Sequence, residues 1–180
     1  IRVGFLSAYF RQHSVGRLMQ GLIERLPKSL FEIVIITPPG QRDPINRAIT
    51  AAADRTLNIP PELSDAWTAI AAEELDILFY ADIGMDVRTY FLAFARLAPV
   101  QCVTWGHPDT TGIPNMDYFL SSALIEPNGA TTEYSENLYL LETLPTCYLR
   151  PKIPGRLKTR ENLGLDNGKR IYSVSYTHLT

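Results

Sequence analysis

One histidine lies where general-base chemistry would need it, just before the start of a helix. His13 follows the first apolar run and directly precedes Ser14, the predicted N-cap of that helix. The positive end of a helix dipole disfavours imidazolium, so a histidine here stays neutral near pH 7 and can accept a proton. The alternative is an exposed loop histidine with no chemical role. The position of His13 alone leaves both interpretations open.

A second histidine and one carboxylate could bind a ligand. His107 precedes Pro108, which favours an extended backbone at the histidine; its ring could hydrogen-bond a ligand or pack against Trp105. Asp82 and Asp86 are spaced like a carboxylate pair, but Asp86 is explained as a helix N-cap, which leaves Asp82 for a ligand. Because no third ligand lies nearby in the sequence, we predict substrate binding at Asp82 and no metal site.

Polar groups concentrate in the loop WGHPDTTG at residues 105–112. Thr110 and Thr111 offer hydroxyls, and Gly112 offers a backbone N–H, to a sugar or phosphate; the alternative is ordinary turn chemistry. We predict that substrate contacts His107, Pro108, Thr110, Thr111 and Gly112. The sequence has no GxGxxG after its first strand, no GxxxxGK(S/T) and no GxSxG, so dinucleotide, P-loop and serine-hydrolase sites have no support.

Strands alternating with helices must position these residues. Apolar, β-branched runs predict strands at residues 1–7, 31–37, 55–59, 77–80 and 100–104. Helices are predicted between them: 15–26 after Ser14, 43–53 with Pro44 at the first helical position, one after Ser64 burying Trp67, Ile70 and Ala71, and one after Asp86 burying Tyr90, Phe94 and Leu97. This alternation predicts an α/β fold with a Rossmann-like, doubly wound, mostly parallel sheet.

The predicted sheet brings three polar loops to one edge. The loops at residues 8–13, 81–85 and 106–115 each follow a strand directly. They therefore fall on the carboxyl edge, where open α/β sheets bind ligands.

The pattern loosens beyond residue 119. A helical turn at 131–135, a strand at 138–141, a short helix at 159–165 and a strand beginning at 170 are predicted. We expect a Rossmann-like lobe at residues 1–145, a linker at 146–169 and the start of a further lobe at 170–180.

Composition narrows the class of protein. The 180 residues are 46% hydrophobic and 20% charged, with a net charge of −2 and no basic run, so we expect no nucleic-acid partner. No apolar stretch approaches the roughly 18 residues that cross a bilayer, and no signal-peptide pattern is present. Cys102 and Cys147 lack metal-ligand spacing, which favours reduced thiols in a cytoplasmic protein.

Five long segments carry a family resemblance. In chain order they are IRVGFLSAYFRQHSVGRLMQGLIERLP, FEIVII, LDILFYADIGMD, LAPVQCVTWGHPDTTGIPNMDYFLSS and YSENLYLLETLPTCY. Over residues 1–173 the sequence resembles the N-terminal catalytic lobe of the O-linked N-acetylglucosamine transferase family, including its bacterial, Spindly-like members.

The resemblance implies a GT-B architecture of two Rossmann-like lobes. It implies inverting transfer of a sugar, with N-acetylglucosamine first among candidates, from a UDP-sugar to Ser or Thr of a protein acceptor, without a further cofactor. His13 matches an active-site histidine proposed as a base, so the resemblance implies that His13 is catalytic, and the loop at 106–112 faces the same cleft. The family varies at the His107 position, and a second family histidine is absent from the segment WTAIAAEE.

The resemblance also implies parts that this sequence lacks. The family has a C-terminal lobe that supplies most UDP contacts and upstream tetratricopeptide repeats that recruit acceptors. We therefore expect this chain alone to be inactive. Residues 174–180 depart from the family pattern, and we expect them not to be native sequence. The alternative is a non-catalytic, Rossmann-like domain that binds a small ligand or a partner.

Overall fold

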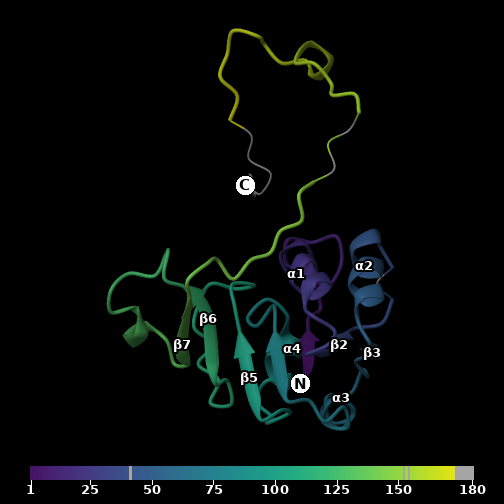
Figure 1. The fold of residues 1–180 in the computed structure, drawn as a ribbon, viewed down its shortest axis with the longest axis vertical. Coiled ribbons are helices and arrows are strands. Elements are labelled where there is room, and N and C mark those ends of the chain that lie inside the picture. Colours follow the sequence, from purple (N-terminus) through teal and green to yellow (C-terminus); the bar gives the residue numbers. More distant parts are fainter. Residues whose placement is uncertain (41, 152, 154, 173–180) are drawn as a thin grey trace. The chain divides into compact units, whose positions relative to one another are not determined.

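Short β-branched runs form the central sheet. The computed structural model describes residues 1–40, 42–151, 153 and 155–172. Within them, seven strands form one sheet in which every pairing is parallel (Figure 1). The strands are β1 (Arg2–Leu6), β2 (Glu32–Thr37), β3 (Arg55–Asn58), β4 (Ile77–Tyr80), β5 (Val100–Val103), β6 (Tyr118–Ser122) and β7 (Asn137–Leu141). The predicted doubly wound α/β class is confirmed.

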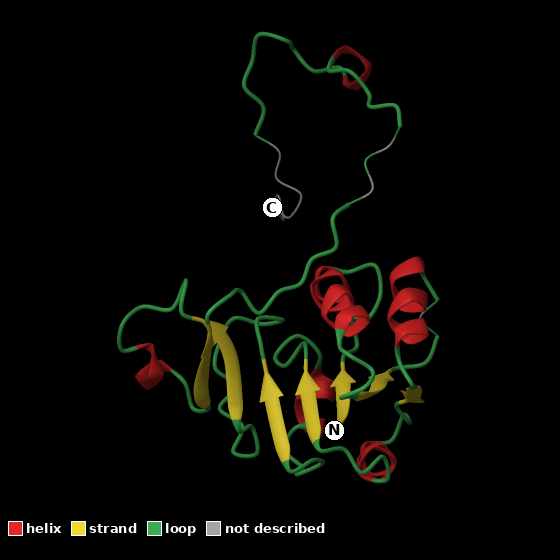
Figure 2. Ribbon diagram, viewed as in Figure 1, coloured by secondary structure: helices red, strands yellow, loops and turns green. Residues whose placement is uncertain are grey.

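Helices cover both faces of one half of this sheet (Figure 2). They are α1 (Ser14–Arg25), α2 (Pro44–Ala52), α3 (Leu63–Ala71) and α4 (Val87–Leu92). Alternate residues of β2 supply two separate cores: Ile33 and Ile35 pack with α1 and α2, whereas Val34 and Ile36 pack with α3 and α4. Such near-continuous apolar strands are typical of parallel sheets that are buried on both faces.

The strand order locates the position where a ligand would bind. The order is β3-β2-β1-β4-β5-β6-β7, so the chain leaves β1 toward β2 on one side and later returns to place β4 on the other. The loops after β1 and β4 therefore diverge from this point at the carboxyl edge, which is the usual ligand position in doubly wound sheets.

Four details of the predicted helices are wrong. Ser14 is the first residue of α1, and His13 is its N-cap, because the imidazole reaches the Val15 N–H. Similarly, α3 begins at Leu63 rather than after Ser64, and Glu62 at its N-cap makes no side-chain capping bond. With that register Ala66 and Ile70 are buried, while Ala71 is exposed.

The fourth error concerns Phe94. Asp86 caps α4 as predicted, accepting hydrogen bonds from the N–H groups of Arg88 and Thr89. The helix ends at Leu92, so the helical spacing that would have buried Phe94 does not continue, and that ring is 44% exposed. Pro44 is the first residue of α2, as predicted, and Asp43 caps this helix by accepting hydrogen bonds from the N–H groups of Ile45 and Asn46.

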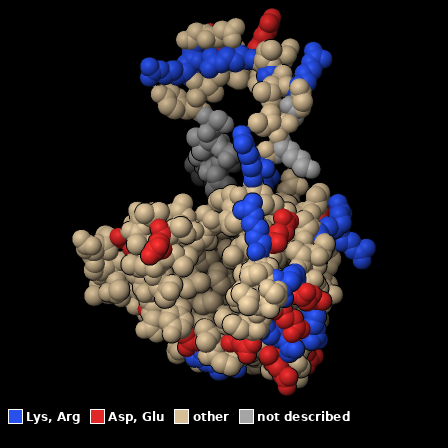
Figure 3. All heavy atoms as spheres, in the orientation of Figure 1, with Lys and Arg blue, Asp and Glu red and all other residues tan. Residues whose placement is uncertain are grey.

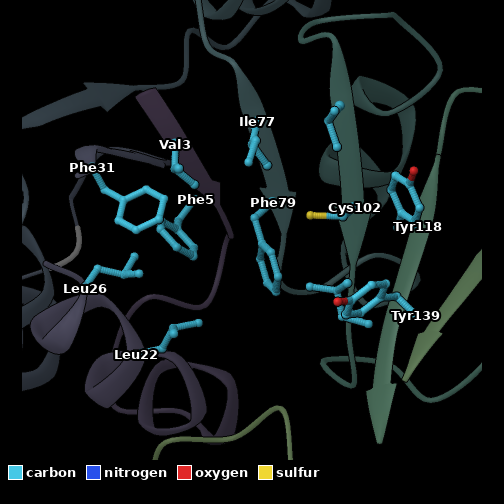
Figure 4. A pocket seen from close by; sticks show the side chains of 12 residues that line it. Val3, Phe5, Leu22, Leu26, Phe31, Ile77, Phe79, Cys102, Tyr118 and Tyr139 are labelled. Atoms are coloured by element: carbon cyan, nitrogen blue, oxygen red, sulfur yellow. The ribbon is translucent and has the colours of Figure 1, made fainter. Parts of the chain in front are cut away.

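The other half of the sheet is bare on the α1 face. Neither β5 to β6 nor β6 to β7 is joined through an α-helix. An apolar pocket of about 430 Å³ results, into which Phe79, Cys102, Tyr118 and Tyr139 project opposite Leu22 of α1 (Figure 4). From the same side, Lys, Arg, Asp and Glu gather over the helical half, while uncharged atoms dominate over β5–β7 (Figure 3).

The chain divides into two units, Ile1–Leu149 and Arg150–Thr180. In the second, the helix predicted at residues 159–165 is reduced to a 3₁₀ turn at Glu161–Leu163. Residues 170–172 form no strand, and the rest of that predicted strand lies outside the described residues. The expectation about residues 174–180 also lies outside them. In the first unit, the helical turn predicted at 131–135 is a 3₁₀ turn at Ala130–Glu133.

Candidate functional site

The loops after β1 and β4 are joined by hydrogen bonds to one carboxylate. Asp82 Oδ2 accepts hydrogen bonds from the Ala8 backbone N–H (2.9 Å) and the Ser7 hydroxyl (3.2 Å). Tyr9 adds a second link, because its hydroxyl donates to the Met85 carbonyl oxygen (3.1 Å). The two loops predicted to share an edge therefore lie in direct contact at the β1/β4 position.

Asp82 is fully buried, and only one of its oxygens is paired. Burial raises the pKa of its carboxyl to about 7, against the hydrogen bonds from Ala8 and Ser7; the Asp86 charge adds to the rise. The Thr89 hydroxyl also lowers this pKa, but its own bond goes to the Asp86 carbonyl oxygen (3.0 Å). Within the described residues Asp82 Oδ1 has no hydrogen-bond partner. A buried carboxyl with a free oxygen can hold a proton near neutral pH.

His13 is held in a defined orientation. Its Nδ1 accepts a hydrogen bond from the Val15 N–H (3.3 Å), and its ring stacks on Tyr9 with 4.5 Å between centroids. Burial and the Arg11 charge both lower the pKa of His13, so the ring is neutral near pH 7. Since Nδ1 is an acceptor, the proton of the neutral ring resides on Nε2. In this state Nε2 donates a hydrogen bond, and a base role at Nε2 would require Nδ1 to give up the cap.

His107 packs against the loop that follows β4. A Cβ on Gly84 would lie 3.1 Å from the His107 ring, so the ring packs directly over that glycine. Its Nδ1 receives only a long hydrogen bond from the Asp109 N–H (3.4 Å). The Trp105 indole N–H instead donates to the Ser121 hydroxyl (3.0 Å). His107 is half-buried beside the β1/β4 loops and Pro108 is exposed.

The rest of the predicted substrate loop is directed toward a carboxylate that the sequence did not single out. Glu136, which is buried, accepts hydrogen bonds from the Thr110 hydroxyl (2.7 Å), the Thr111 N–H (2.8 Å) and the Thr111 hydroxyl. The Gly112 N–H donates to the Ser135 hydroxyl (3.0 Å). Burial alone would raise the pKa of Glu136, but the bonds from Thr111 and Thr110 outweigh it and lower that pKa. These groups therefore fix the loop in the structure.

A pocket of about 350 Å³ lies next to His13. Ser14, Val15 and Leu18 of α1 form one wall and Trp105 and Gly106 another. The wall opposite consists of Leu144, Thr146 and Tyr148. This pocket is bounded by the first turn of α1, where His13 is the cap, and by the start of the substrate loop.

The segment that closes this pocket is held against α1. Gly21 permits the contact, because a Cβ there would overlap the Cys147 carbonyl oxygen. Arg25 Nη1 also donates to Cys147 Sγ (3.2 Å). Both Cys102 and Cys147 are free thiols.

The sequence and the fold are both similar to those of known proteins. Residues 1–149 match the family model for glycosyl transferase family 41. This chain belongs to glycosyl transferase family 41. A solved structure of a mutant Thermobaculum terrenum O-GlcNAc transferase is similar, with a TM-score of 0.78 and 26% sequence identity. The match covers 86% of the present chain and 30% of the transferase chain. The predicted Rossmann-like lobe of a GT-B enzyme is thereby confirmed as the fold.

Two curated relatives carry different names. An Arabidopsis thaliana protein, "Probable UDP-N-acetylglucosamine--peptide N-acetylglucosaminyltransferase SPINDLY", is 25% identical over 158 residues, 83% of this chain and 16% of its own length. An Actinobacillus pleuropneumoniae protein, "UDP-glucose:protein N-beta-glucosyltransferase", is 41% identical over 44 residues, 24% of this chain and 7% of its own. The family-41 chain thus spans less than a third of the length of each of these relatives.

In the part of the chain that the structure describes, no three His, Cys, Asp or Glu side chains group as metal ligands would. Across the same residues, none of the helices has the length and apolar character to span a membrane.

Proposed function

We propose that this chain is the N-terminal catalytic lobe of an enzyme that moves a sugar from a UDP-sugar to a protein. The observation that carries the proposal is the joining of the β1, β4 and β5 loops around the position of His13. Asp82 bonds the first loop to the second, and His107 packs on Gly84 of the second. Because the chain belongs to glycosyl transferase family 41, we propose sugar transfer as the reaction at this edge of the sheet.

N-acetylglucosamine is the donor sugar that we propose first. The SPINDLY relative, which aligns with 83% of this chain, is named for that sugar, whereas the glucosyltransferase relative aligns with 24%. We propose Ser or Thr of a protein as acceptor. Transfer with inversion breaks the bond between the anomeric carbon and the UDP oxygen, while the acceptor oxygen attacks from the opposite face and loses its proton.

His13 is the residue we propose to act nearest the transferred sugar. It caps α1 beside the pocket formed with Trp105 and Gly106. Two roles are open to its Nε2: it donates a hydrogen bond while Nδ1 caps the helix, or it accepts the acceptor's proton after the cap bond is released. We propose that His107 and Pro108 contact substrate directly, that Thr110, Thr111 and Gly112 present the loop to it, and that Asp82 holds the β1 loop.

The activity requires more polypeptide than these 180 residues. We propose that a second lobe supplies most of the UDP contacts and that upstream tetratricopeptide repeats recruit the acceptor. We also propose a cytoplasmic protein, in which the thiols of Cys102 and Cys147 stay reduced.

A transfer assay tests the proposal. The longer protein containing this lobe would be incubated with an acceptor protein and either UDP-N-acetylglucosamine or UDP-glucose, and glycosylated residues would be located by mass spectrometry. We expect transfer from UDP-N-acetylglucosamine to Ser or Thr, and none by the 180-residue chain alone. Failure with both donors, together with saturable binding of a small ligand at this edge, would favour the non-catalytic binding domain instead.

A further inference from the structure

A polar pocket of about 530 Å³ lies between α2 and the edge strand β3. Thr37, at the end of β2, and Thr56 and Asn58, on β3, line it from the sheet. Arg47 and Thr50 line it from α2. It shares no lining residue with the pocket next to His13.

The strand register explains why this pocket is polar. Thr37 pairs with Asn58 and Ile35 pairs with Thr56, and directly paired residues in parallel strands project to the same face. That face is the one on which Ile33 and Ile35 pack against α1 and α2. Hydroxyl and amide side chains therefore occupy places where the apolar core would otherwise continue.

The Thr37 hydroxyl has no partner in this pocket. Thr37 is only 3% exposed, and among the described residues its Oγ1 makes no hydrogen bond. A buried hydroxyl without a partner lowers stability, and native proteins rarely keep one unless another group satisfies it. Thr37 therefore leaves an unpaired hydroxyl at the wall of the pocket.

The charge on the pocket is positive. Arg42 and Arg47 both line it, and no Asp or Glu does so among the described residues. Within that part of the chain neither guanidinium forms an ion pair. Arg47 Nη1 donates to the Arg42 carbonyl oxygen (2.5 Å), which fixes the two arginines relative to each other.

Asp43, the nearest carboxylate in the sequence, is occupied elsewhere. One oxygen accepts hydrogen bonds from the N–H groups of Ile45 and Asn46, and the other accepts one from Gln12 (2.6 Å). It offsets one of the two positive charges without offering the pocket a free acceptor. Among the described residues, the charged side chains that line the cavity are therefore those of Arg42 and Arg47.

We propose that this pocket binds a phosphate group. A phosphate presents several acceptor oxygens in different directions, which matches hydroxyls from β2 and β3 combined with guanidinium groups from α2 and the preceding loop. The phosphate can be the free ion, an ester on a phosphorylated side chain, or the diphosphate of a nucleotide.

NMR titration of the 180-residue chain tests the proposal and separates these sources. The probes are inorganic phosphate, O-phosphoserine and UDP, with serine as the control that lacks phosphate. We expect saturable shifts of amide signals in residues 37–40, 46–50 and 56–58, and none with serine. The probe that binds most tightly identifies the source. Absence of saturable shifts with all three phosphates would overturn the proposal.

Three variants make the test specific. Arg47→Gln should weaken phosphate binding about tenfold, because it removes a charge-assisted hydrogen bond. Thr37→Val should weaken binding while raising the Tm, since it removes an unpaired buried hydroxyl; a purely structural Thr37 would change only the Tm. Arg17→Gln is the matched control, because Arg17 is an exposed arginine on α1 away from the pocket. If Arg17→Gln and Arg47→Gln weakened phosphate binding equally, the binding would depend only on the net charge of the protein, and the proposal would be overturned.

Discussion

Asp82→Asn should make the free energy of unfolding of this chain less dependent on pH. Burial, and secondarily the Asp86 charge, raise the pKa of Asp82 from 3.8 to about 7. The folded state therefore binds this proton more tightly than the unfolded state. Its contribution to stability is complete below pH 3.8 and is lost as the pH rises to about 7. The full loss is about 4 kcal/mol, of which about 3 kcal/mol falls between pH 5 and pH 8.

Asparagine keeps the shape of this carboxyl and does not titrate. Its side-chain oxygen can still accept the hydrogen bonds from Ala8 and Ser7. The two proteins should therefore have similar stability near pH 5, where Asp82 is protonated. The variant should become the more stable one toward pH 8.

Urea denaturation of both proteins at several pH values between these limits measures the difference directly. Asp86→Asn is an informative control, because an asparagine can still cap α4 while the charge that helps raise the Asp82 pKa is removed. In that variant the folded-state pKa of Asp82 is lower, so the loss of stability should be smaller and should end at a lower pH. A constant stability difference between the original chain and Asp82→Asn across the whole range would refute the reasoning.

Three further predictions concern the loops. His13→Asn keeps a side chain that can cap α1, so the Tm of the chain should be nearly unchanged. The same substitution should lower transfer by the longer protein at least about a hundredfold. Transfer at the original rate would show that His13 has no part in the mechanism. Glu136→Gln removes charge-assisted hydrogen bonds to the substrate loop and should cost about 1.5–3 kcal/mol in urea denaturation; a loss below about 0.5 kcal/mol would contradict the anchoring role. Gly106→Ala would place a Cβ against the Ala81 carbonyl oxygen and should lower the free energy of unfolding by at least about 2 kcal/mol. Gly112→Ala, at φ +65° and in open space, should lower it by about 1 kcal/mol. Equal shifts of Tm for the two variants would contradict this difference.

The sheet and its edge were predictable because they depend on local patterns. Runs such as residues 31–37 are apolar and β-branched, and Asp43 and Asp86 precede helices at the standard capping distance. The predicted N-cap at Ser14 was wrong because serine is a commoner cap than histidine, and no local pattern shows that the His13 imidazole accepts a hydrogen bond from the Val15 N–H. The predicted burial of Phe94 was wrong because the helical spacing continues in the sequence after α4 has ended at Leu92.

The Glu136 contacts could not be predicted from local patterns. Glu136 lies 25 residues beyond Thr111, and no spacing rule connects a carboxylate before β7 with a loop after β5. Only the parallel pairing of β5, β6 and β7 brings the two together. The local pattern predicted substrate contacts for Thr110 and Thr111, and it gave no sign of their bonds to Glu136.

Carboxylates shape this edge of the sheet by the same means in three places. Asp82 accepts the Ala8 N–H, Asp43 accepts the Gln12 N–H, and Glu136 accepts the Thr111 N–H. Each bond joins a loop at the carboxyl edge to a neighbouring element. The pKa values of Asp43 and Glu136 are lowered, so their bonds are charge-assisted and stronger than neutral ones, and they restrict loop motion where the proposed transfer needs fixed geometry. The proposed chemistry therefore rests on His13 and His107, and the carboxylates position the loops that carry them.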